Sequence, residues 1–249
     1  MMHLDKALTR ILSKEAKHKI REKFKLLAKD ILKDVEDLFT HPNLQQKVKL
    51  ELLDVKILKN ITRKVVMNEN VSKYLKSYCQ WQGEKKIAKK KWFYSVLFTG
   101  LDLFYLDQYG SEVRSSTGRG YMKGMCSNKN SCTLLEWHPD NIAYILTHEI
   151  AHSLGMSHDG PPNNECRGQR HIMDAKYNPK NPAKTWSPLP LFLFDCFIAE
   201  SFPSRKGLKE SMMSCYLPNQ SEAIRCRLGL RDCSKGLPRP SRSILKEHR

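Results

Sequence analysis

Hydrophobic residues recur at three- and four-residue steps along the first forty residues. Between residues 4 and 39 the apolar side chains fall on one face, and lysine and glutamate occupy much of the rest. This spacing predicts a helical segment with one packed face. Pro42 cannot continue a helix, so the segment should end near Thr40. The stretch Val48–Leu58 largely alternates between apolar and polar residues, which predicts a β-strand.

Regular elements are also predicted further along the chain. The patterns indicate a second helix, a compact apolar strand and a third helix at Val71–Trp81, Tyr94–Thr99 and Asp140–Leu154. The glycine-punctuated stretch Ser115–Gly124 predicts a short edge strand around Tyr121 and Met122. Residues 155–203 are rich in proline and predict loops.

Strands that alternate with helices favour an α/β domain, with the loop-rich segment as a small second lobe. We divide the chain into an N-terminal helical segment over residues 1–45 and a central domain over residues 46–217. A basic tail that contains cysteine follows over residues 218–249. The tail ends in Ser234–Arg249, where basic residues and prolines predict disorder.

The composition is strongly basic, with 43 lysine and arginine residues against 26 acidic ones and a formal net charge of +17. Such a balance favours polyanionic surroundings: nucleic acid, a heparin-like glycan or an anionic membrane. The cluster Lys85–Lys91 has the same three interpretations as any basic run: a nuclear or nucleic-acid signal, a heparin or matrix contact, or a solvated loop. We favour the loop, and we expect no nucleic-acid partner, because no aromatic–basic alternation or zinc-finger spacing accompanies the charge.

Cysteine usage indicates an oxidising compartment. The chain has eight cysteines and no CxxC pair, which favours disulfides over a zinc ribbon. Sequons at Asn60, Asn70 and Asn219 fit secretion. The first residues are charged and lack the apolar core of a signal peptide, and no apolar run reaches the roughly 20 residues of a membrane span. We therefore expect a secreted, extracellular protein whose signal peptide is absent from this chain, as in a fragment or an incomplete gene model.

The segment Thr147–Gly160, THEIAHSLGMSHDG, carries the chemistry. His148 and His152 are four residues apart on a predicted helix, so both imidazoles project from one face. Gly155 can adopt positive φ and turn the chain, which brings His158 back towards them. Three neutral imidazoles make a tetrahedral zinc site with a fourth position open for water.

Glu149 follows the first of these histidines but points to another part of the helix surface. It is placed to hold the zinc-bound water, take its proton and return that proton to the leaving amine of a cleaved peptide bond. The alternative is two exposed or core histidines on an amphipathic helix. That alternative must also explain Gly155, His158 and Asp159 at their fixed offsets.

The stretch HEIAHSLGMSHD resembles the HExxHxxGxxHD signature of the metzincins, in particular the adamalysin or reprolysin branch. This branch includes the ADAM enzymes, the ADAM enzymes with thrombospondin motifs, and venom metalloproteinases of snakes, ticks and scorpions. Asp159 directly after the third histidine favours this branch over the matrixins. Further segments resemble the family in the right order, namely YCQWQ, LFTGLDL, GRGYMKGMCS and HIMDAKY, and the resemblance covers roughly residues 30–217.

The resemblance implies an α/β (α+β) fold with a mixed twisted sheet, long helices, an active-site helix and a small irregular C-terminal lobe. It also implies a role for several residues. His148, His152 and His158 would bind one Zn²⁺ per chain, with Glu149 as general base and acid. Asp159 would support the turn as a hydrogen-bond partner, and Met173 would form a hydrophobic floor beneath the ligands. The stretch Gly120–Gly124 would be the edge against which a substrate pairs, and Ala175 and Tyr177 would line the pocket after the scissile bond. The implied disulfides are Cys79–Cys132, Cys126–Cys215 and Cys166–Cys196, which leaves Cys226 with Cys233.

Two departures from the family stand out. The family's catalytic domain opens with an apolar strand before its first helix, and the sequence shows no such strand here, so we expect it to be missing. The family pattern of Trp-Ser followed closely by cysteine is interrupted here: Pro188–Asp195 separates Trp186-Ser187 from Cys196. This stretch is either the end of a retained intron or a genuine hydrophobic loop.

These observations favour a secreted zinc metalloendopeptidase. Its substrate would be an extended segment of an extracellular-matrix or plasma protein, with a heparin-like polyanion as a possible further partner. Two alternatives stay open. One is an inactive or truncated family member that serves as a binding or toxin module, and the other is a basic polyanion-binding protein whose histidine motif is incidental.

Overall fold

The computed structural model describes residues 1–15, 19–44, 48–58, 65–89, 92–114, 118–125, 127–161, 163, 171–176 and 178–187. Within them, five strands form one sheet in the order β2-β1-β3-β7-β6. These strands are β1 (Met2–Leu4), β2 (Val55–Ile57), β3 (Ser95–Thr99), β6 (Gly118–Gly120) and β7 (Cys132–Glu136). All neighbours in this sheet are parallel except β6, which is antiparallel to β7 and forms the edge.

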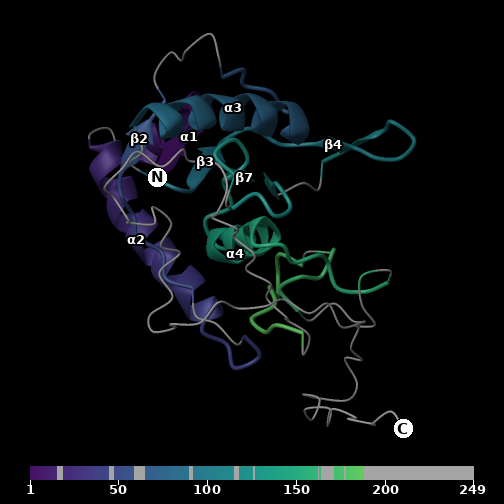
Figure 1. The fold of residues 1–249 in the computed structure, drawn as a ribbon. Coiled ribbons are helices and arrows are strands. Elements are labelled where there is room, and N and C mark those ends of the chain that lie inside the picture. The colour runs from purple at the N-terminus through teal and green to yellow at the C-terminus, as the bar shows by residue number, and fades with distance from the viewer. Residues whose placement is uncertain are drawn as a thin grey trace, which may run out of the picture.

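Helices cover the sheet on both faces. They are α1 (Lys6–Glu15), α2 (Ile20–Leu38), α3 (Val71–Lys89) and α4 (Ile142–Ser153). In Figure 1, α3 runs along one side of the sheet, and α2 and α4 lie on the other. Two short strands, β4 (Tyr105–Leu106) and β5 (Glu112–Val113), form a separate hairpin that projects from the body.

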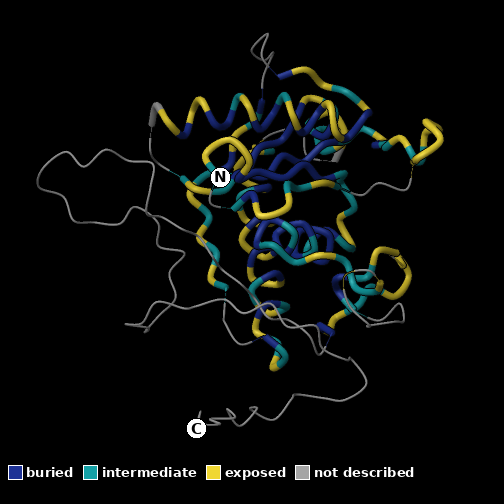
Figure 2. Tube along the Cα trace, turned by 45° about the vertical axis from the view of Figure 1, so that its right-hand side comes forward, coloured by how far each residue is buried: buried dark blue, intermediate teal, exposed yellow. Residues whose placement is uncertain are grey.

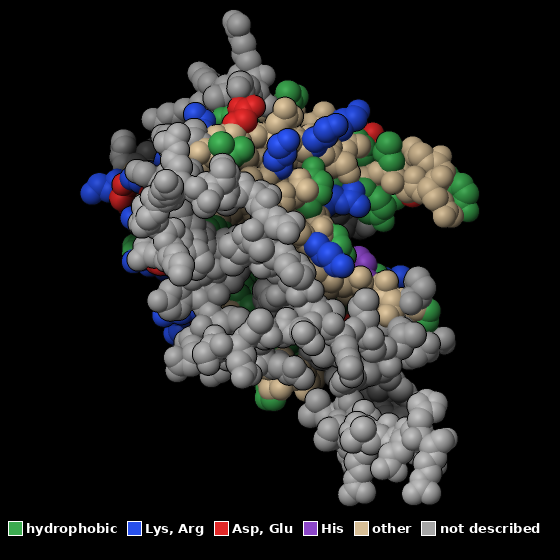
Figure 3. All heavy atoms as spheres, in the orientation of Figure 1, with side chains coloured by type: hydrophobic (Ala, Val, Ile, Leu, Met, Phe, Trp, Pro, Cys, Tyr) green, Lys and Arg blue, Asp and Glu red, His purple; other side chains and the backbone are tan. Residues whose placement is uncertain are grey.

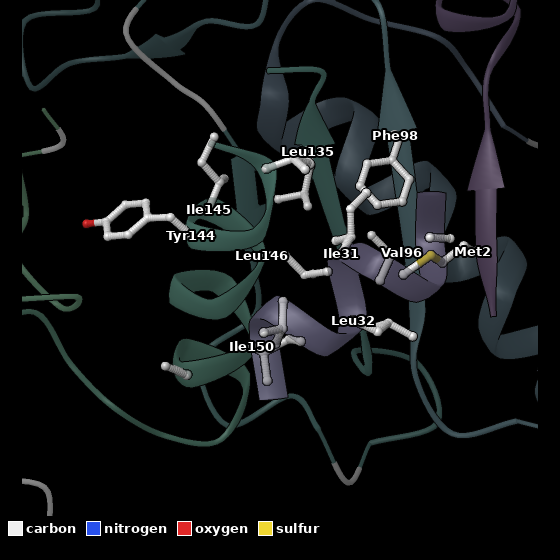
Figure 4. Close-up of a cluster of buried hydrophobic side chains, with 14 of the residues drawn as sticks. Met2, Ile31, Leu32, Val96, Phe98, Leu135, Tyr144, Ile145, Leu146 and Ile150 are labelled. Atoms are coloured by element: carbon white, nitrogen blue, oxygen red, sulfur yellow. The ribbon is translucent and has the colours of Figure 1, made fainter. Parts of the chain in front are cut away.

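The core is split by the sheet into two apolar clusters. Because side chains alternate along a strand, Val96 and Phe98 of β3 face α2 and α4, whereas Leu97 faces α3. Figure 4 shows the first cluster, in which Ile31 of α2 and Leu146 of α4 meet the strand side chains. In Figure 2, β1, β3, most of β7 and most of α4 are dark blue, because they are buried. Helix α4, which carries the histidine motif, therefore packs against a buried apolar core.

The N-terminal residues differ from the single helical segment that the sequence pattern predicted. Met2–Leu4 is a strand between β2 and β3, and its three side chains are buried. Asp5 then begins α1 by accepting a hydrogen bond from the Leu8 N–H at 2.8 Å. Lys19, at φ 68°, precedes α2. The first strand, expected to be missing, is thus present. A three-residue strand buried on both faces has no alternation by which to recognise it.

Other predicted elements change in extent. The strand predicted at Tyr94–Thr99 and the helix predicted at Asp140–Leu154 are found as β3 and α4. Of the predicted strand Val48–Leu58, only Val55–Ile57 pairs with a neighbour. Within the stretch predicted as an edge strand, pairing occurs at Gly118–Gly120, and Tyr121–Gly124 is a turn closed by the Gly124 N–H and the Tyr121 carbonyl.

The lysine cluster is not a solvated loop over its described part. Helix α3 continues to Lys89, and its three- and four-residue spacing brings Lys86 onto the buried face. The Lys86 Nζ donates to the Ser131 hydroxyl oxygen at 2.7 Å and to the Ser131 carbonyl. Burial lowers the pKa of Lys86 to about 7. Trp186 is buried.

Candidate metal centre and active-site cleft

Three histidine side chains converge beside α4. His148 and His152 lie one turn apart on that helix, and His158 comes from the segment that follows it. The Nε2 atom of His158 lies 3.2 Å from that of His148 and 3.0 Å from that of His152. Ligand atoms of the three residues all lie within 4.8 Å of one another. The structure thus brings together the three residues that the sequence pattern singled out.

The turn at Gly155 makes this convergence possible. Gly155 has φ 105°, a backbone conformation that residues with a Cβ rarely adopt. Its N–H donates to the His152 carbonyl at 2.9 Å, and the Met156 N–H donates to the Ala151 carbonyl at 3.0 Å. These bonds end the helix and reverse the chain, as the glycine in the motif predicted.

Backbone carbonyls fix the orientation of two of the rings. The His148 Nδ1 donates to the Ile172 carbonyl at 2.6 Å, and the His152 Nδ1 donates to the Met156 carbonyl at 2.7 Å. With the proton on Nδ1, each Nε2 presents a lone pair to the centre. Burial lowers the pKa of His148 to about 3 and that of His152 to about 4, so both rings stay neutral.

This donor set fits a zinc ion. The His158 Nε2 carries at most one hydrogen, which it can donate to only one of the other two Nε2 atoms. At least one pair of lone pairs therefore faces each other at 3.0–3.2 Å and repels unless a cation lies between them. Two zinc–nitrogen bonds of ordinary length at a tetrahedral angle would separate their nitrogens by about 3.3 Å. Neutral imidazoles with the second ring nitrogen bonded to a carbonyl are also the form in which histidine binds metals.

Glu149 lies next to this centre and is buried. Burial raises the pKa of its carboxyl group to about 7, although a hydrogen bond from the Gly120 N–H and the charge of Arg119 both act to lower it. A Cβ at Gly120 would lie 3.1 Å from the Glu149 carbonyl oxygen and from the Ser153 Oγ. Glycine at this position therefore lets the edge strand approach the helix closely, which the sequence pattern did not reveal.

Asp159 and Met173 are held by hydrogen bonds and by packing in the core. The Asp159 N–H donates to the Met173 carbonyl at 2.9 Å, and the Ser187 hydroxyl donates to the Asp159 Oδ1 at 2.9 Å. Met173 itself is buried in the core cluster that includes Ile172 and Trp186. The Trp186 Nε1 donates to the Leu38 carbonyl at 2.7 Å, so the end of α2 holds this segment in place.

A cleft of about 1120 Å³ opens over the histidines. Its walls come from β6, the base of the hairpin, α4 and the segment after Met173. They include Tyr105, Arg114, Gly118, Arg119, Gly120, Glu136, His138, His148, Glu149, His152, His158, Asp174, Ala175 and Lys176. Figure 3 shows a hollow below the projecting hairpin, with a histidine in purple at its floor. Ala175 lies in the wall of the cleft, and Tyr177 lies outside the described residues.

Several cleft residues were not predicted from the sequence. Arg119 lies between two glycines of β6, and its Nη1 donates to the Ser72 hydroxyl at 2.7 Å. Glu136 ends β7 and lies 3.2 Å from the His138 Nε2. A charged residue at the end of an apolar strand was the available signal for Glu136. No local pattern indicates that Arg119 faces the cleft.

The disulfide Cys79–Cys132 joins α3 to the start of β7, as the family resemblance implied. The partners of the two other implied disulfides, Cys126–Cys215 and Cys166–Cys196, lie outside the described residues, as do Cys226, Cys233 and the stretch Pro188–Asp195. No helix in the described part of the chain is both long enough and apolar enough to cross a membrane.

Comparison with known proteins decides the family. A family model described as "Reprolysin (M12B) family zinc metalloprotease" matches residues 14–201, which is well over half of the chain. This chain belongs to the reprolysin family. The matched residues include α4 with His148, Glu149 and His152, and the turn at Gly155 that returns His158 to them.

Human relatives of this reprolysin are distant and much longer. "A disintegrin and metalloproteinase with thrombospondin motifs 19" is 28% identical over 160 residues, which are 59% of this chain and 13% of the relative. "A disintegrin and metalloproteinase with thrombospondin motifs 16" is 28% identical over 159 residues, which are 64% of this chain and 13% of the relative. The chain therefore matches about an eighth of the length of these relatives.

The fold also has a counterpart among solved structures. A chain of "Structure of a chaperone-substrate complex" aligns with 74% of this reprolysin and 31% of its own length, with a TM-score of 0.50 and 13% identity. At this identity the likeness concerns the fold alone.

Proposed function

We propose that this chain is a zinc metalloendopeptidase that hydrolyses peptide bonds in extended protein segments. The observation that carries the proposal is the convergence of His148, His152 and His158 beside Glu149, at the floor of a cleft. When bound by these three imidazoles, zinc would supply Lewis-acid chemistry, which lowers the pKa of water and polarises a carbonyl.

Glu149 would act as the general base. Its carboxylate is buried beside the ligands and is held by the Gly120 N–H, so its direction is fixed before substrate binds. In this role it takes a proton from the attacking water and returns it to the leaving amine. His148 and His152 keep their orientation through the carbonyls of Ile172 and Met156.

The edge strand β6 would align the substrate. One side of Gly118–Gly120 pairs with β7, and the three residues line the cleft. An extended peptide can add to such an edge through main-chain hydrogen bonds. Arg119 is tied to Ser72 of α3, which supports the strand from outside the sheet.

The alternative of an inactive binding module loses its main support. A missing first strand would have favoured it, and β1 is present between β2 and β3. We further propose that the protein is secreted and acts on an extracellular-matrix or plasma protein. The Cys79–Cys132 disulfide supports this location, because disulfides persist mainly in oxidising compartments. Binding of a heparin-like polyanion stays a prediction from the net charge of +17.

The test measures zinc content and cleavage of fluorescein-labelled gelatin side by side. The wild type is compared with Glu149→Ala and with the control Glu22→Ala, which removes an exposed carboxylate from α2. We expect one zinc per chain in all three proteins, and cleavage only in wild type and Glu22→Ala. Chelation should abolish that cleavage, and zinc should restore it. Cleavage by Glu149→Ala at the wild-type rate, or a folded protein that binds no zinc, would contradict the proposal.

A further inference from the structure

The β4–β5 hairpin exposes two large apolar side chains near the cleft. Leu106 is 52% exposed and Tyr109 is 83% exposed. Figures 1 and 2 both show the hairpin projecting from the body, and its tip is yellow in Figure 2 because it is exposed. Single exposed apolar residues are common on protein surfaces. Two of them on one ordered projection next to a cleft need a further explanation.

The tip of the hairpin is a defined turn. The Asp107 Oδ1 accepts hydrogen bonds from the Tyr109 and Ser111 N–H groups, each at 2.9 Å. The Asp107 N–H donates to the Ser111 carbonyl at 3.0 Å, and Gly110 has φ 81°, which suits glycine. The Tyr109 side chain is therefore presented from a fixed backbone, which reduces the entropy lost when a partner binds.

The base of the hairpin is anchored by Arg114. Its guanidinium lies 2.9 Å from Glu69, 3.2 Å from Asp102 and 3.4 Å from Glu112. Its Cζ also lies 5.3 Å from the centre of the Phe104 ring. Each exposed ion pair alone contributes little. Together they connect β5 to the segments on either side and keep the hairpin at the end of the cleft.

The hairpin continues the wall of the cleft. Tyr105 and Arg114, at its base, line the cleft together with Gly118 of the edge strand. A segment that pairs with β6 and extends beyond it in this direction passes the base of the hairpin and then its exposed side chains. The hairpin is thus continuous with the surface that would align a substrate.

The charge at this end differs from that of the whole chain. Against a formal net charge of +17, five carboxylates lie at the hairpin and its surroundings, against two guanidinium groups, Arg114 and Arg119. These acidic residues are Glu69, Asp102, Asp107, Glu112 and Glu136. Such a field favours a basic group in the segment that lies along it.

We propose that the β4–β5 hairpin is a second contact site for the protein substrate, outside the catalytic centre. It binds an apolar or aromatic side chain that has a basic neighbour, in the part of the substrate that extends past the cleft. This inference rests on the proposed function, because it assigns the occupant as the segment whose peptide bond is cleaved.

The experiment measures binding without cleavage. The zinc-loaded Glu149→Gln protein is titrated into fluorescein-labelled, unstructured peptides of about sixteen residues, which span about 50 Å when extended. The peptides share one sequence except near both ends, where they carry Phe-Lys, Phe-Glu or Gly-Gly. Dissociation constants come from fluorescence anisotropy. The hairpin variant is Leu106→Ser with Tyr109→Ser, and the matched control is Leu26→Ser, which removes an equally exposed apolar residue from α2.

We expect the Phe-Lys peptide to bind about tenfold more tightly than the Gly-Gly peptide, as one good aromatic contact allows. The hairpin variant should lose this gain, and the Leu26→Ser control should keep it. Equal melting temperatures and zinc contents of the variants establish that folding is intact. Leu106→Ser alone should lose part of the gain.

Three results would overturn the inference: equal binding of the Phe-Lys and Gly-Gly peptides, a gain that survives in the hairpin variant, or an equal loss in the Leu26→Ser control. Equal binding of the Phe-Glu and Phe-Lys peptides would overturn the preference for a basic neighbour. The protein with Glu149 intact is then incubated with the same peptides. Hairpin-dependent binding without any cleavage would count against the proposed function alone, so the two failures are distinguishable.

Discussion

Replacing Asp5 by alanine should destabilise this protein more than any comparable change at an exposed carboxylate. Asp5 is buried at the junction of β1 and α1. Its Oδ1 accepts hydrogen bonds from the Leu8 N–H at 2.8 Å and the Gly100 N–H at 3.4 Å. Its Oδ2 accepts from the hydroxyls of Tyr74 at 3.0 Å and Thr99 at 2.5 Å. One side chain therefore joins β1, α1, α3 and the end of β3.

The size of the effect follows from what each donor loses. Alanine removes the cap of α1, which costs about 1 kcal/mol. It also leaves buried donors unpaired, at about 1–3 kcal/mol each. Relief of the cost of burying a carboxylate offsets part of this loss. We expect Asp5→Ala to lower the free energy of unfolding by about 3–5 kcal/mol, a large part of the total for an ordinary domain.

Asparagine at the same position should cost less, about 1–2 kcal/mol. Its amide oxygen can keep the two N–H donors, and the hydroxyls of Tyr74 and Thr99 can rotate to accept from its amide nitrogen. Asparagine is also a good helix cap. Asparagine therefore costs less than alanine: its amide oxygen still accepts from the backbone N–H groups, and the two hydroxyl groups can change from hydrogen-bond donors to acceptors.

Urea denaturation followed by circular dichroism measures both variants, with Asp30→Ala on the exposed face of α2 as control. The control should change the free energy of unfolding by less than about 0.5 kcal/mol. The reasoning is refuted if asparagine costs as much as alanine, or if alanine costs no more than the control. The second result would also show that residues 1–5 do not form part of the cooperative fold.

Three further changes test other features. Lys86→Met should remove a pH dependence of stability: because burial lowers the pKa of Lys86 to about 7, the unfolded wild type binds more protons above that pH. Wild-type stability should therefore rise relative to Lys86→Met by about 2 kcal/mol between pH 7 and pH 9 in urea titrations, and parallel profiles would contradict this. Gly155→Ala should cost about 1–3 kcal/mol and weaken zinc binding, since φ 105° is strained for alanine and Lys123 lies 3.3 Å from the new Cβ. The control is Gly110→Ala, where φ is 81° and space is open: it should cost a similar backbone penalty but leave zinc affinity unchanged. Competition with a zinc-sensitive dye measures the zinc affinity of both glycine variants. Equal zinc affinities of the two variants would refute the link between the turn and the site. His158→Ala should reduce zinc content below one per chain by mass spectrometry, and full retention would exclude it as a ligand.

The local sequence determined the chemistry at the centre of this protein. Helical spacing alone puts His148 and His152 on one face, and Gly155 alone permits the turn that returns His158. These are short-range consequences of backbone geometry, so they can be read without knowing the rest of the fold. For the same reason the long α4 and the compact β3 were predicted within a residue or two.

Tertiary structure decided the features whose partners lie far away in the sequence. Met2–Leu4 is a strand because β2 and β3 pair with both of its edges, although its own residues continue the pattern of a helix. Lys86 is buried because the loop at Ser131 supplies two oxygen acceptors for its ammonium group. Gly120 has to be a glycine because the Glu149 carbonyl and the Ser153 hydroxyl of α4 lie against it. In each case long-range pairing and packing outweigh the local preference, because burial of a whole segment involves more free energy than the propensity of a few residues.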